Sequence, residues 1–280
     1  MKIKITSDST CDLPQELLRT YGIGIAPLTV VKGDDQFKDG LTITPADIFA
    51  HVAAGGSLCS TAAVSIGEYE DLFRQYAGEY DAVVHINLGS GFSACHQNAR
   101  LAAEEFTNVY CVDSQNLSTG QGLVVLEACR LAQSAESAEA LVDALNAYTE
   151  KVESSFLVEK LDYLVKGGRC SSAAALGANL LNLKPCIEVR NGKMSVGKKY
   201  RGNFSKCLAS YVKERLEGRT DIDPTTIFIT WTQVSDDALV QVRQGVESCA
   251  SFETVLESVA GSSISCHCGP GTLGILYVRK

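Results

Sequence analysis

The sequence predicts an α/β protein with two domains, and three observations support this prediction. Its 280 residues suffice for one large domain or two ordinary ones. Short β-rich segments alternate with helical segments through the first half, and a hairpin signal stands in the second. We therefore expect an N-terminal domain over residues 1–152, with a mostly parallel sheet and helices on both faces. We expect a C-terminal domain over 153–280 with a mixed sheet and helices, and a ligand site in the groove between the two.

In the first half, β-branched runs predict strands and capped amphipathic runs predict helices. Thr44 caps a helix whose first position is Pro45, and Ser65 with Glu68 forms a capping box that opens another. A further helix opens at Asp12, with Pro14 in its first turn. The predicted strands are 2–6, 23–31, 36–38, 81–87 and 108–112, and the other predicted helices are 92–106, 119–133 and 137–150.

The second half mixes two kinds of connection between strands. Asn191-Gly192 suits a type I′ turn and predicts a hairpin around Val189–Met194. The other predicted strands are 226–230, 253–257 and 271–279, and the predicted helices are 203–216 and 236–247. Strands joined partly by hairpins and partly by helices indicate a mixed sheet.

Composition and charge restrict the class of function. The chain carries 25 Lys and Arg against 33 Asp and Glu, a net charge of −8, which argues against a nucleic-acid partner. No segment reaches the roughly 20 apolar residues of a membrane span, and the N-terminus reads as a strand and not as a signal peptide. We expect a cytoplasmic protein whose 11 cysteines are thiols, mostly buried as small apolar side chains.

Two hydroxyl residues stand in segments suited to an anion. Ser93 follows the glycine-rich turn Asn87-Leu-Gly-Ser-Gly-Phe and precedes a predicted helix, whose free N–H groups attract negative charge. Thr61 lies just upstream of the capped helix at Ser65, where its hydroxyl can donate to the same anion. The alternatives are that Ser93 only caps its own helix and that Thr61 is an ordinary loop residue.

One histidine and two basic clusters complete the candidate groups. His267 stands in Ser265-Cys-His-Cys-Gly-Pro-Gly271, which we interpret as a loop before the last strand; a histidine there can donate to a buried anion. Cys266-His267-Cys268 also suggests a metal, but zinc needs three or four ligands at suitable spacing. Arg169 and Arg201 each lie beside glycine in a basic cluster, suited to phosphate or carboxylate, or simply to a solvated face.

An enzyme is the alternative from a different class. Gly91-Phe-Ser93-Ala-Cys95 nearly matches the G-x-S-x-G turn of serine hydrolases. Asp236 and His267 would complete the order Ser, Asp, His, which makes a serine ester hydrolase the rival hypothesis. The phosphate-loop, dinucleotide and H-E-x-x-H signatures are not found in the sequence, so nucleotide chemistry has no support. A redox or metal protein that uses the cysteines is a third hypothesis.

Taken together, several motifs in order resemble those of the DegV family of bacterial fatty-acid-binding proteins. The resemblance spans nearly the whole length. Its motifs are Asp8-Ser-Thr-Cys-Asp-Leu-Pro14, Asp113-Ser114 with Ser118, Gly120 and Gly122, Leu161–Arg169, Lys199-Tyr-Arg-Gly202 and His267-Cys-Gly-Pro-Gly271. Thr61–Tyr69 and Ser93–Arg100 correspond to two further family motifs.

The resemblance implies a lipid carrier and not an enzyme, with no cofactor beyond a bound long-chain fatty acid. The acyl chain would lie in an apolar tunnel, and Thr61, Ser93 and His267 would hold the carboxylate. Some family members present the fatty acid to a fatty-acid kinase for phospholipid synthesis, and Arg169 and Arg201 match the arginines related to that step. We expect the tunnel wall around Leu176, Leu180 and Leu181.

Overall fold

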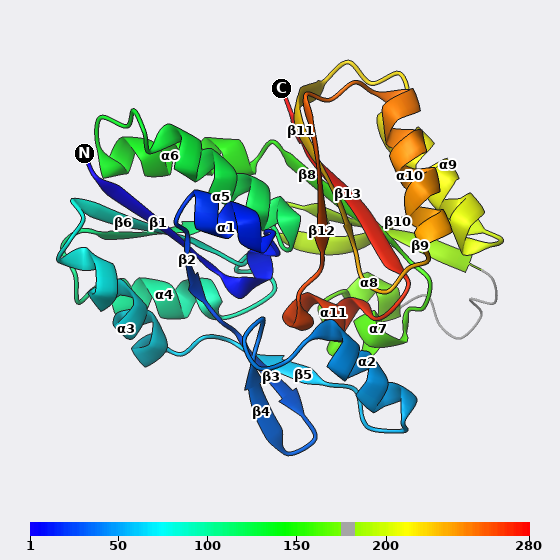
Figure 1. Ribbon diagram of the computed structural model, residues 1–280, viewed down its shortest axis with the longest axis horizontal. Coiled ribbons are helices and arrows are strands. Elements are labelled where there is room, and N and C mark those ends of the chain that lie inside the picture. Colours follow the sequence, from blue (N-terminus) through cyan, green and yellow to red (C-terminus); the bar gives the residue numbers. More distant parts are fainter. Residues whose placement is uncertain (175–182) are drawn as a thin grey trace.

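The N-terminal half is built on a parallel four-stranded sheet. The computed structural model describes residues 1–174 and 183–280. The strand order is β2 (Gly24–Ala26), β1 (Ile3–Asp8), β6 (Ala82–Asn87) and β7 (Val109–Asp113). Helices α3 (Ile66–Ala77) and α4 (Cys95–Ala103) cover one face, and α5 (Thr119–Leu131) and α6 (Ala138–Thr149) cover the other (Figure 1). This confirms the predicted parallel sheet with helices on both faces.

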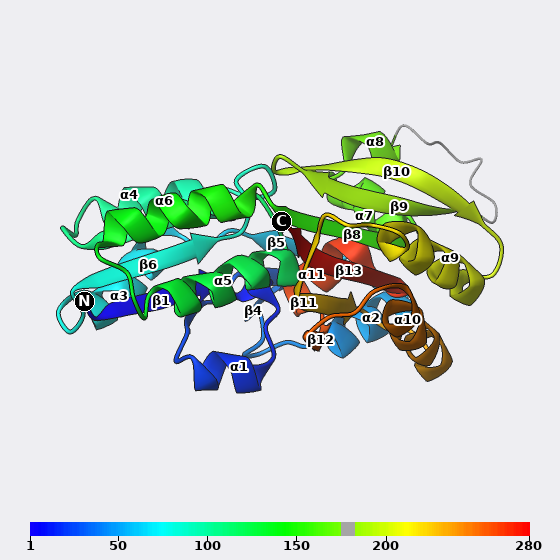
Figure 2. The same ribbon diagram turned by 90° about the horizontal axis from the view of Figure 1, so that it is seen from above.

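The second half is built on a mixed six-stranded sheet, as predicted. Its order is β10 (Lys193–Arg201), β9 (Leu183–Arg190), β8 (Val152–Val158), β13 (Thr272–Arg279), β11 (Ile222–Trp231) and β12 (Thr254–Val259). Only the β11–β12 pair is parallel. Helices α9 (Phe204–Leu216) and α10 (Asp236–Cys249) pack together on one face, visible at the right of Figure 2. The division of the chain into domains at residue 152 stays a prediction.

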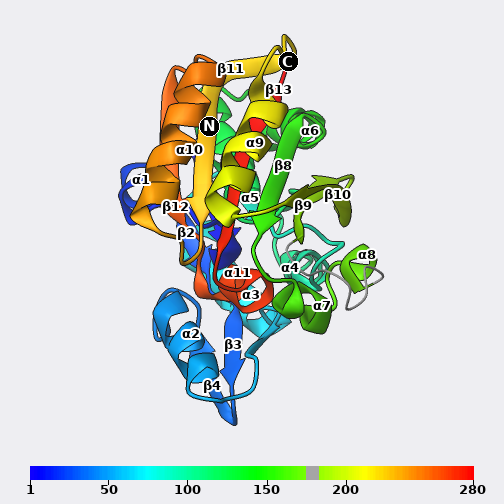
Figure 3. The same cartoon turned by 90° about the vertical axis from the view of Figure 1, so that its right-hand side faces the viewer.

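A third, smaller unit lies at one end of the molecule. Strands β4 (Asp35–Lys38), β3 (Thr29–Lys32) and β5 (Ser60–Ala62) form an antiparallel sheet, joined by α2 (Pro45–Ala53). These elements project below the two larger sheets, where α2 and β5 pack against α11 (Ser262–Cys268) (Figures 1 and 3). A segment of the N-terminal half therefore contacts a helix close to the C-terminus.

Four short helices remain to be described. The 3-10 helix η1 (Ser9–Cys11) and α1 (Gln15–Thr20) follow β1, while α7 (Asp162–Gly167) and α8 (Ser171–Ala174) follow β8. Among the described residues, no helix has the length and apolar character needed to cross a membrane. The 11 cysteines are free.

Four local predictions were wrong. The strand predicted over 23–31 is split between two sheets, because Pro27, which has no N–H to donate, separates β2 from β3. The helix predicted from Phe92 starts only at Cys95, after a turn closed by a Phe92 N–H bond to the Gly89 carbonyl. The helix predicted from Asp12 begins after Pro14, which stands before its first turn.

The fourth error concerns His267. The segment before the last strand is not a loop up to Gly271 but contains helix α11, and His267 lies in its last turn. The helix ends at Gly269, whose φ of 73° is left-handed and favours glycine. The Gly-Pro-Gly run that suggested a loop is thus the stop signal of a short helix.

Candidate functional site

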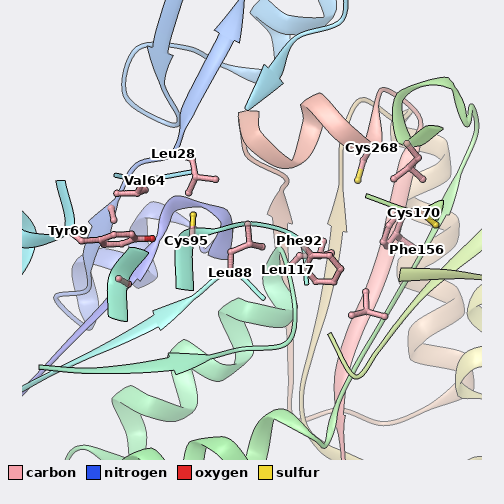
Figure 4. Packing of buried hydrophobic residues seen from close by; sticks show 14 of the residues in the cluster. Leu28, Val64, Tyr69, Leu88, Phe92, Cys95, Leu117, Phe156, Cys170 and Cys268 are labelled. Carbon is pink, nitrogen blue, oxygen red and sulfur yellow. The ribbon is translucent and has the colours of Figure 1, made fainter. Parts of the chain in front are cut away.

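The candidate site is a cavity between the two larger sheets. Its unfilled space, including the open mouth, is about 550 Å³. The wall includes residues from both halves of the chain. Most are apolar: Leu28, Ala63, Leu88, Phe92, Leu117, Leu164, Met194, Ile264 and Cys268. Leu88, Phe92 and Leu117 lie together at the centre of Figure 4, between Leu28 and Cys268.

The polar part of this wall contains all three residues that we predicted for an anion. Thr61, Ser93 and His267 line the same cavity, and so does Arg169. They come from β5, from the turn before α4, from α11 and from the segment after α7, respectively. The structure therefore brings together four of the five predicted site residues from widely separated parts of the sequence.

Thr61 is held against His267. Strand β5 pairs with β3 through Thr61 and Val30, which fixes the backbone at this position. The Thr61 Oγ1 atom lies 2.8 Å from His267 Nε2, so the two groups share a hydrogen bond. The ordinary-loop alternative for Thr61 is wrong, because the residue belongs to a strand and lines the cavity.

His267 is an uncharged group in this environment. Burial, reinforced by the positive charge of Arg169, lowers its pKa to about 4. Its Nδ1 atom is buried and has no hydrogen-bond partner among the described residues. Gly167 allows the ring to fit, since a Cβ at that position would stand 2.6 Å from Nδ1.

Ser93 is placed by a tight turn. Its Oγ accepts a hydrogen bond from the Cys95 N–H at 3.3 Å and donates to the Cys95 Sγ at 3.2 Å. Because Gly91 has no side chain, the turn approaches the tip of the β9–β10 hairpin, where a Cβ on Gly91 would meet the Gly192 carbonyl oxygen at 2.1 Å. Ser93 thus contacts the first residue of α4 and lines the cavity, but it is not the N-cap of this helix, which is Ala94.

The prediction from the sequence missed Ser263. This residue lies one helical turn before His267 on α11, is 2 % exposed and lines the same cavity. Its Oγ has no partner among the described residues. The signal was the i, i+4 spacing of Ser263 and His267, which places both on one helix face. It went unused because we interpreted this segment as a loop.

The two predicted arginines are not equivalent. Arg169 is exposed at the cavity wall, and its guanidinium donates to the Gly167 carbonyl at 2.7 Å. Arg201 is also exposed but stands at the end of β10, paired with Leu183 of β9, and does not line the cavity. Only Arg169 therefore lies within reach of a ligand.

A second cavity adjoins the first. It shares Leu117, Ile264 and Cys268 with the first cavity and has about 380 Å³ of unfilled space. Its further wall comes from β8, β9, β11 and β13, including Phe156, shown in Figure 4. We call the first cavity, which Thr61 lines, the outer cavity and the second, which Ser154 lines, the inner cavity. Leu176, Leu180 and Leu181, expected in the tunnel wall, lie outside the described residues.

The hydrolase hypothesis finds no support in this geometry. A catalytic serine needs a histidine within hydrogen-bond reach and an acid on the other ring nitrogen. Ser93 bonds to Cys95 and not to His267. The Nδ1 atom of His267 has no partner in residues 1–174 and 183–280, which include Asp236, so Asp236 does not orient the ring. No group of three potential metal ligands is found in the described part of the chain, and Cys266 and Cys268 form no such group with His267.

The fold and the site define an α/β protein with a mainly apolar cavity between its two larger sheets and polar groups at one part of the cavity wall. This chain belongs to the DegV family: residues 2–280 match the family model described as "Uncharacterised protein, DegV family". A DegV domain-containing protein of Clostridium acetobutylicum is 32% identical over 285 residues, covering 100% of this chain and 99% of the relative.

Solved structures of the family resemble the chain over its whole length. A DegV family protein from Thermus thermophilus, described by its fatty-acid binding, is 31% identical with a TM-score of 0.89, covering 100% of both chains. DegV of Bacillus subtilis, described as a fatty acid binding protein, is 26% identical with a TM-score of 0.83, again over 100% of both. The family recognised from the motifs is therefore confirmed.

Proposed function

We propose that this protein binds one long-chain fatty acid, with the acyl chain in the adjoining cavities and the carboxylate beside Thr61, Ser93 and His267. The observation that carries the proposal is that these three residues line one cavity whose remaining wall is mostly apolar. The relatives from Thermus thermophilus and Bacillus subtilis, both described as binding fatty acids, support it.

The physical chemistry of a fatty acid fits this wall. Each buried methylene contributes roughly 0.8 kcal/mol, so a long chain supplies ample affinity even after the cost of association. The carboxylate is the difficult part, because a buried charge without partners is strongly unfavourable. Hydroxyl groups from Thr61 and Ser263 offer neutral donors to it, and Ser93 adds a third once its hydroxyl turns from the Cys95 sulfur to the ligand. Arg169 adds a positive charge at the wall.

The hydrogen bond between His267 and Thr61 decides whether the threonine hydroxyl can donate to the ligand. Since the imidazole is neutral, only one of its nitrogens carries a proton. If that proton is on Nε2, it is donated to Thr61 Oγ1, and the threonine hydroxyl keeps its own proton for the ligand. In the other tautomer the proton is on Nδ1, so Thr61 must donate its own proton to Nε2. The Nδ1–H then has no acceptor among the described residues. We therefore assign the proton of His267 to Nε2 in the complex.

We further propose that the protein is a carrier that presents its fatty acid to a fatty-acid kinase, and not a catalyst. Arg169 supports this, because it is exposed and also lines the cavity, so a partner and the ligand can both reach it. Arg201 is exposed on β10 and available to a partner surface.

Mass spectrometry of organic extracts from the purified protein tests the binding proposal. We expect close to one equivalent of long-chain fatty acid, and we expect delipidated protein to take up added fatty acid to the same level. An extract without fatty acid, together with no uptake of added acid, would contradict the proposal.

A further inference from the structure

The inner cavity contains more hydroxyl groups than an unsubstituted hydrocarbon chain requires. Its wall is apolar at Leu117, Phe156, Val189 and Leu276. Five hydroxyl residues also contribute to it: Ser118, Ser154, Thr230, Thr232 and Thr272. Whether these groups are available to a ligand depends on which of them the protein already satisfies.

Three of the five are engaged within the protein. Ser118 donates to a carboxylate oxygen of Asp12 at 2.5 Å. Thr232 and Thr272 donate to backbone carbonyl oxygens at 2.8 and 3.0 Å. Their hydroxyl protons are therefore not free for a ligand.

Ser154 is different. It stands on β8, is 1 % exposed, and its Oγ has no hydrogen-bond partner among the described residues. The absence of a side chain at Gly120 makes room for it, because a Cβ there would lie 2.3 Å from this oxygen. Leaving a buried hydroxyl unpaired costs free energy, and such groups in native proteins usually meet a water or a ligand.

Thr230, on β11, is the fifth hydroxyl residue of this wall. The hydroxyls of Thr230 and Thr119 lie 2.6 Å apart and share one hydrogen bond. One of the two protons is used in that bond, and no acceptor for the other is found in the described part of the chain. The inner cavity thus offers Ser154, a group that both donates and accepts, while the spare proton of the threonine pair belongs either to Thr230 or to Thr119, which does not line the cavity.

We infer that the inner cavity selects acyl chains that carry a hydroxyl group away from the carboxylate, so that the preferred ligand is a hydroxylated long-chain fatty acid. This inference rests on the proposed function and specifies its substrate. Within the cavity a ligand hydroxyl bonds to Ser154, which removes the cost of both unpaired groups. An unsubstituted chain leaves Ser154 unpaired against methylene groups.

The geometry also places the hydroxyl along the chain. The carboxylate lies in the outer cavity beside Thr61 and Ser93. Ser154 lines only the inner cavity, whereas Leu117, Ile264 and Cys268 line both. A hydroxyl next to the carboxylate would remain in the outer cavity and gain nothing from Ser154. A hydroxyl near the middle of the chain or beyond it reaches the inner cavity.

Displacement titrations on delipidated protein test the inference with three ligands of equal length: octadecanoic acid, octadecanoic acid hydroxylated near mid-chain or beyond, and the same acid hydroxylated next to the carboxylate. We expect a mid-chain or distal hydroxyl to tighten binding about three- to tenfold over the unsubstituted acid, the effect of one neutral hydrogen bond. The acid hydroxylated beside the carboxylate is expected to show no such gain.

Equal affinities, with the unsubstituted acid bound normally, would overturn the inference and leave the proposed function intact. Failure of all three ligands to bind would overturn both.

Two serine variants on the same strand complete the test. Ser154→Ala is expected to lower the ratio of affinities, hydroxylated to unsubstituted, to about one. Ser155→Ala is the matched control, because its hydroxyl lies 2.8 Å from Tyr211 Oη on the other face of the sheet and it does not line either cavity. An unchanged ratio in Ser154→Ala would overturn the inference. If that variant does not fold, Ser154→Cys, which replaces the hydroxyl with a weak donor, is expected to lower the same ratio, and an unchanged ratio in that variant would count equally against the inference.

Discussion

Asp39 accepts a hydrogen bond of 2.8 Å from the backbone N–H of Ser262, 223 positions later in the sequence. A second carboxylate acts alongside it, since Asp12 accepts from the Gly261 N–H at 2.9 Å. Both acceptors are buried and come from the N-terminal half. They fix the start of α11, the helix that carries Ser263 and His267, relative to the sheet that carries Thr61.

Removal of the Asp39 carboxylate should affect both the stability of the protein and its binding of fatty acid. We expect Asp39→Ala to lower the free energy of unfolding by about 1–3 kcal/mol, because the Ser262 N–H loses a buried acceptor. We also expect weaker fatty-acid binding, since α11 is no longer held in place. Urea denaturation and a fatty-acid titration measure the two effects. Asp35→Ala, at an exposed residue of β4, is the control and should change neither.

The carboxylate site is tested by Thr61→Val combined with Ser93→Ala. Each variant removes one hydroxyl, and a hydrogen bond to a charged group contributes about 1.5–3 kcal/mol. We therefore expect the affinity for a fatty acid to fall by at least about tenfold, with the protein still folded by circular dichroism. The fatty alcohol of equal length has no carboxylate and should lose much less. An unchanged affinity for the acid would remove both residues from the site.

Ser263 gives an independent test of the same site. Its unpartnered hydroxyl lines the outer cavity, so we expect Ser263→Ala to weaken fatty-acid binding by about threefold or more. Ser262→Ala is a useful comparison, because the neighbouring hydroxyl donates to the Ile43 carbonyl and does not line the cavity. Isothermal titration calorimetry measures both. A loss of affinity only in Ser262→Ala would contradict the assignment of Ser263.

His267 predicts a specific pH dependence of stability. Its pKa is lowered to about 4 in the folded protein against about 6.5 in the unfolded chain, so between these values only the unfolded chain binds the proton. The contribution of His267 is therefore fully present above about pH 6.5 and is lost as the pH falls towards 4. Between pH 6.5 and 4 we expect the free energy of unfolding of His267→Gln to fall by about 1–3 kcal/mol less than that of the wild type, as measured by urea titrations. Parallel pH profiles of variant and wild type would contradict the shift.

The kinase proposal is tested through Arg201. This residue does not line either cavity, so we expect Arg201→Ala to bind fatty acid like the wild type and to form less acyl phosphate when mixed with a bacterial fatty-acid kinase and ATP. Arg190→Ala, at another exposed arginine on the neighbouring strand β9, serves as the control. Loss of lipid binding in Arg201→Ala would show that this arginine contributes to the lipid site.

Local signals in the sequence predicted most of the fold. Capping residues such as Thr44 and Ser65 define helix starts without tertiary information, and both capping boxes are present. The Asn191-Gly192 turn likewise lies between β9 and β10, with both residues at positive φ. The split at Pro27 was not predicted, because the assignment of β2 and β3 to different sheets depends on distant partners.

The candidate site was predicted in part for a similar reason. Thr61, Ser93 and His267 were identified from their local segments and from the family motifs, but nothing local shows that Thr61 and His267 lie 2.8 Å apart. Ser263 and Ser154 were missed because an unpaired hydroxyl is a property of the folded protein. A serine that finds a partner and one that does not look identical in the sequence.

The late position of α11 in the chain has a consequence for biosynthesis. Thr61 and Ser93 leave the ribosome long before Ser263 and His267, yet the outer cavity needs all four. A nascent chain that stops short of α11 lacks one wall of this cavity and two of its polar groups. If the protein binds a fatty acid as proposed, it acquires this lipid only after nearly all of this chain has been translated.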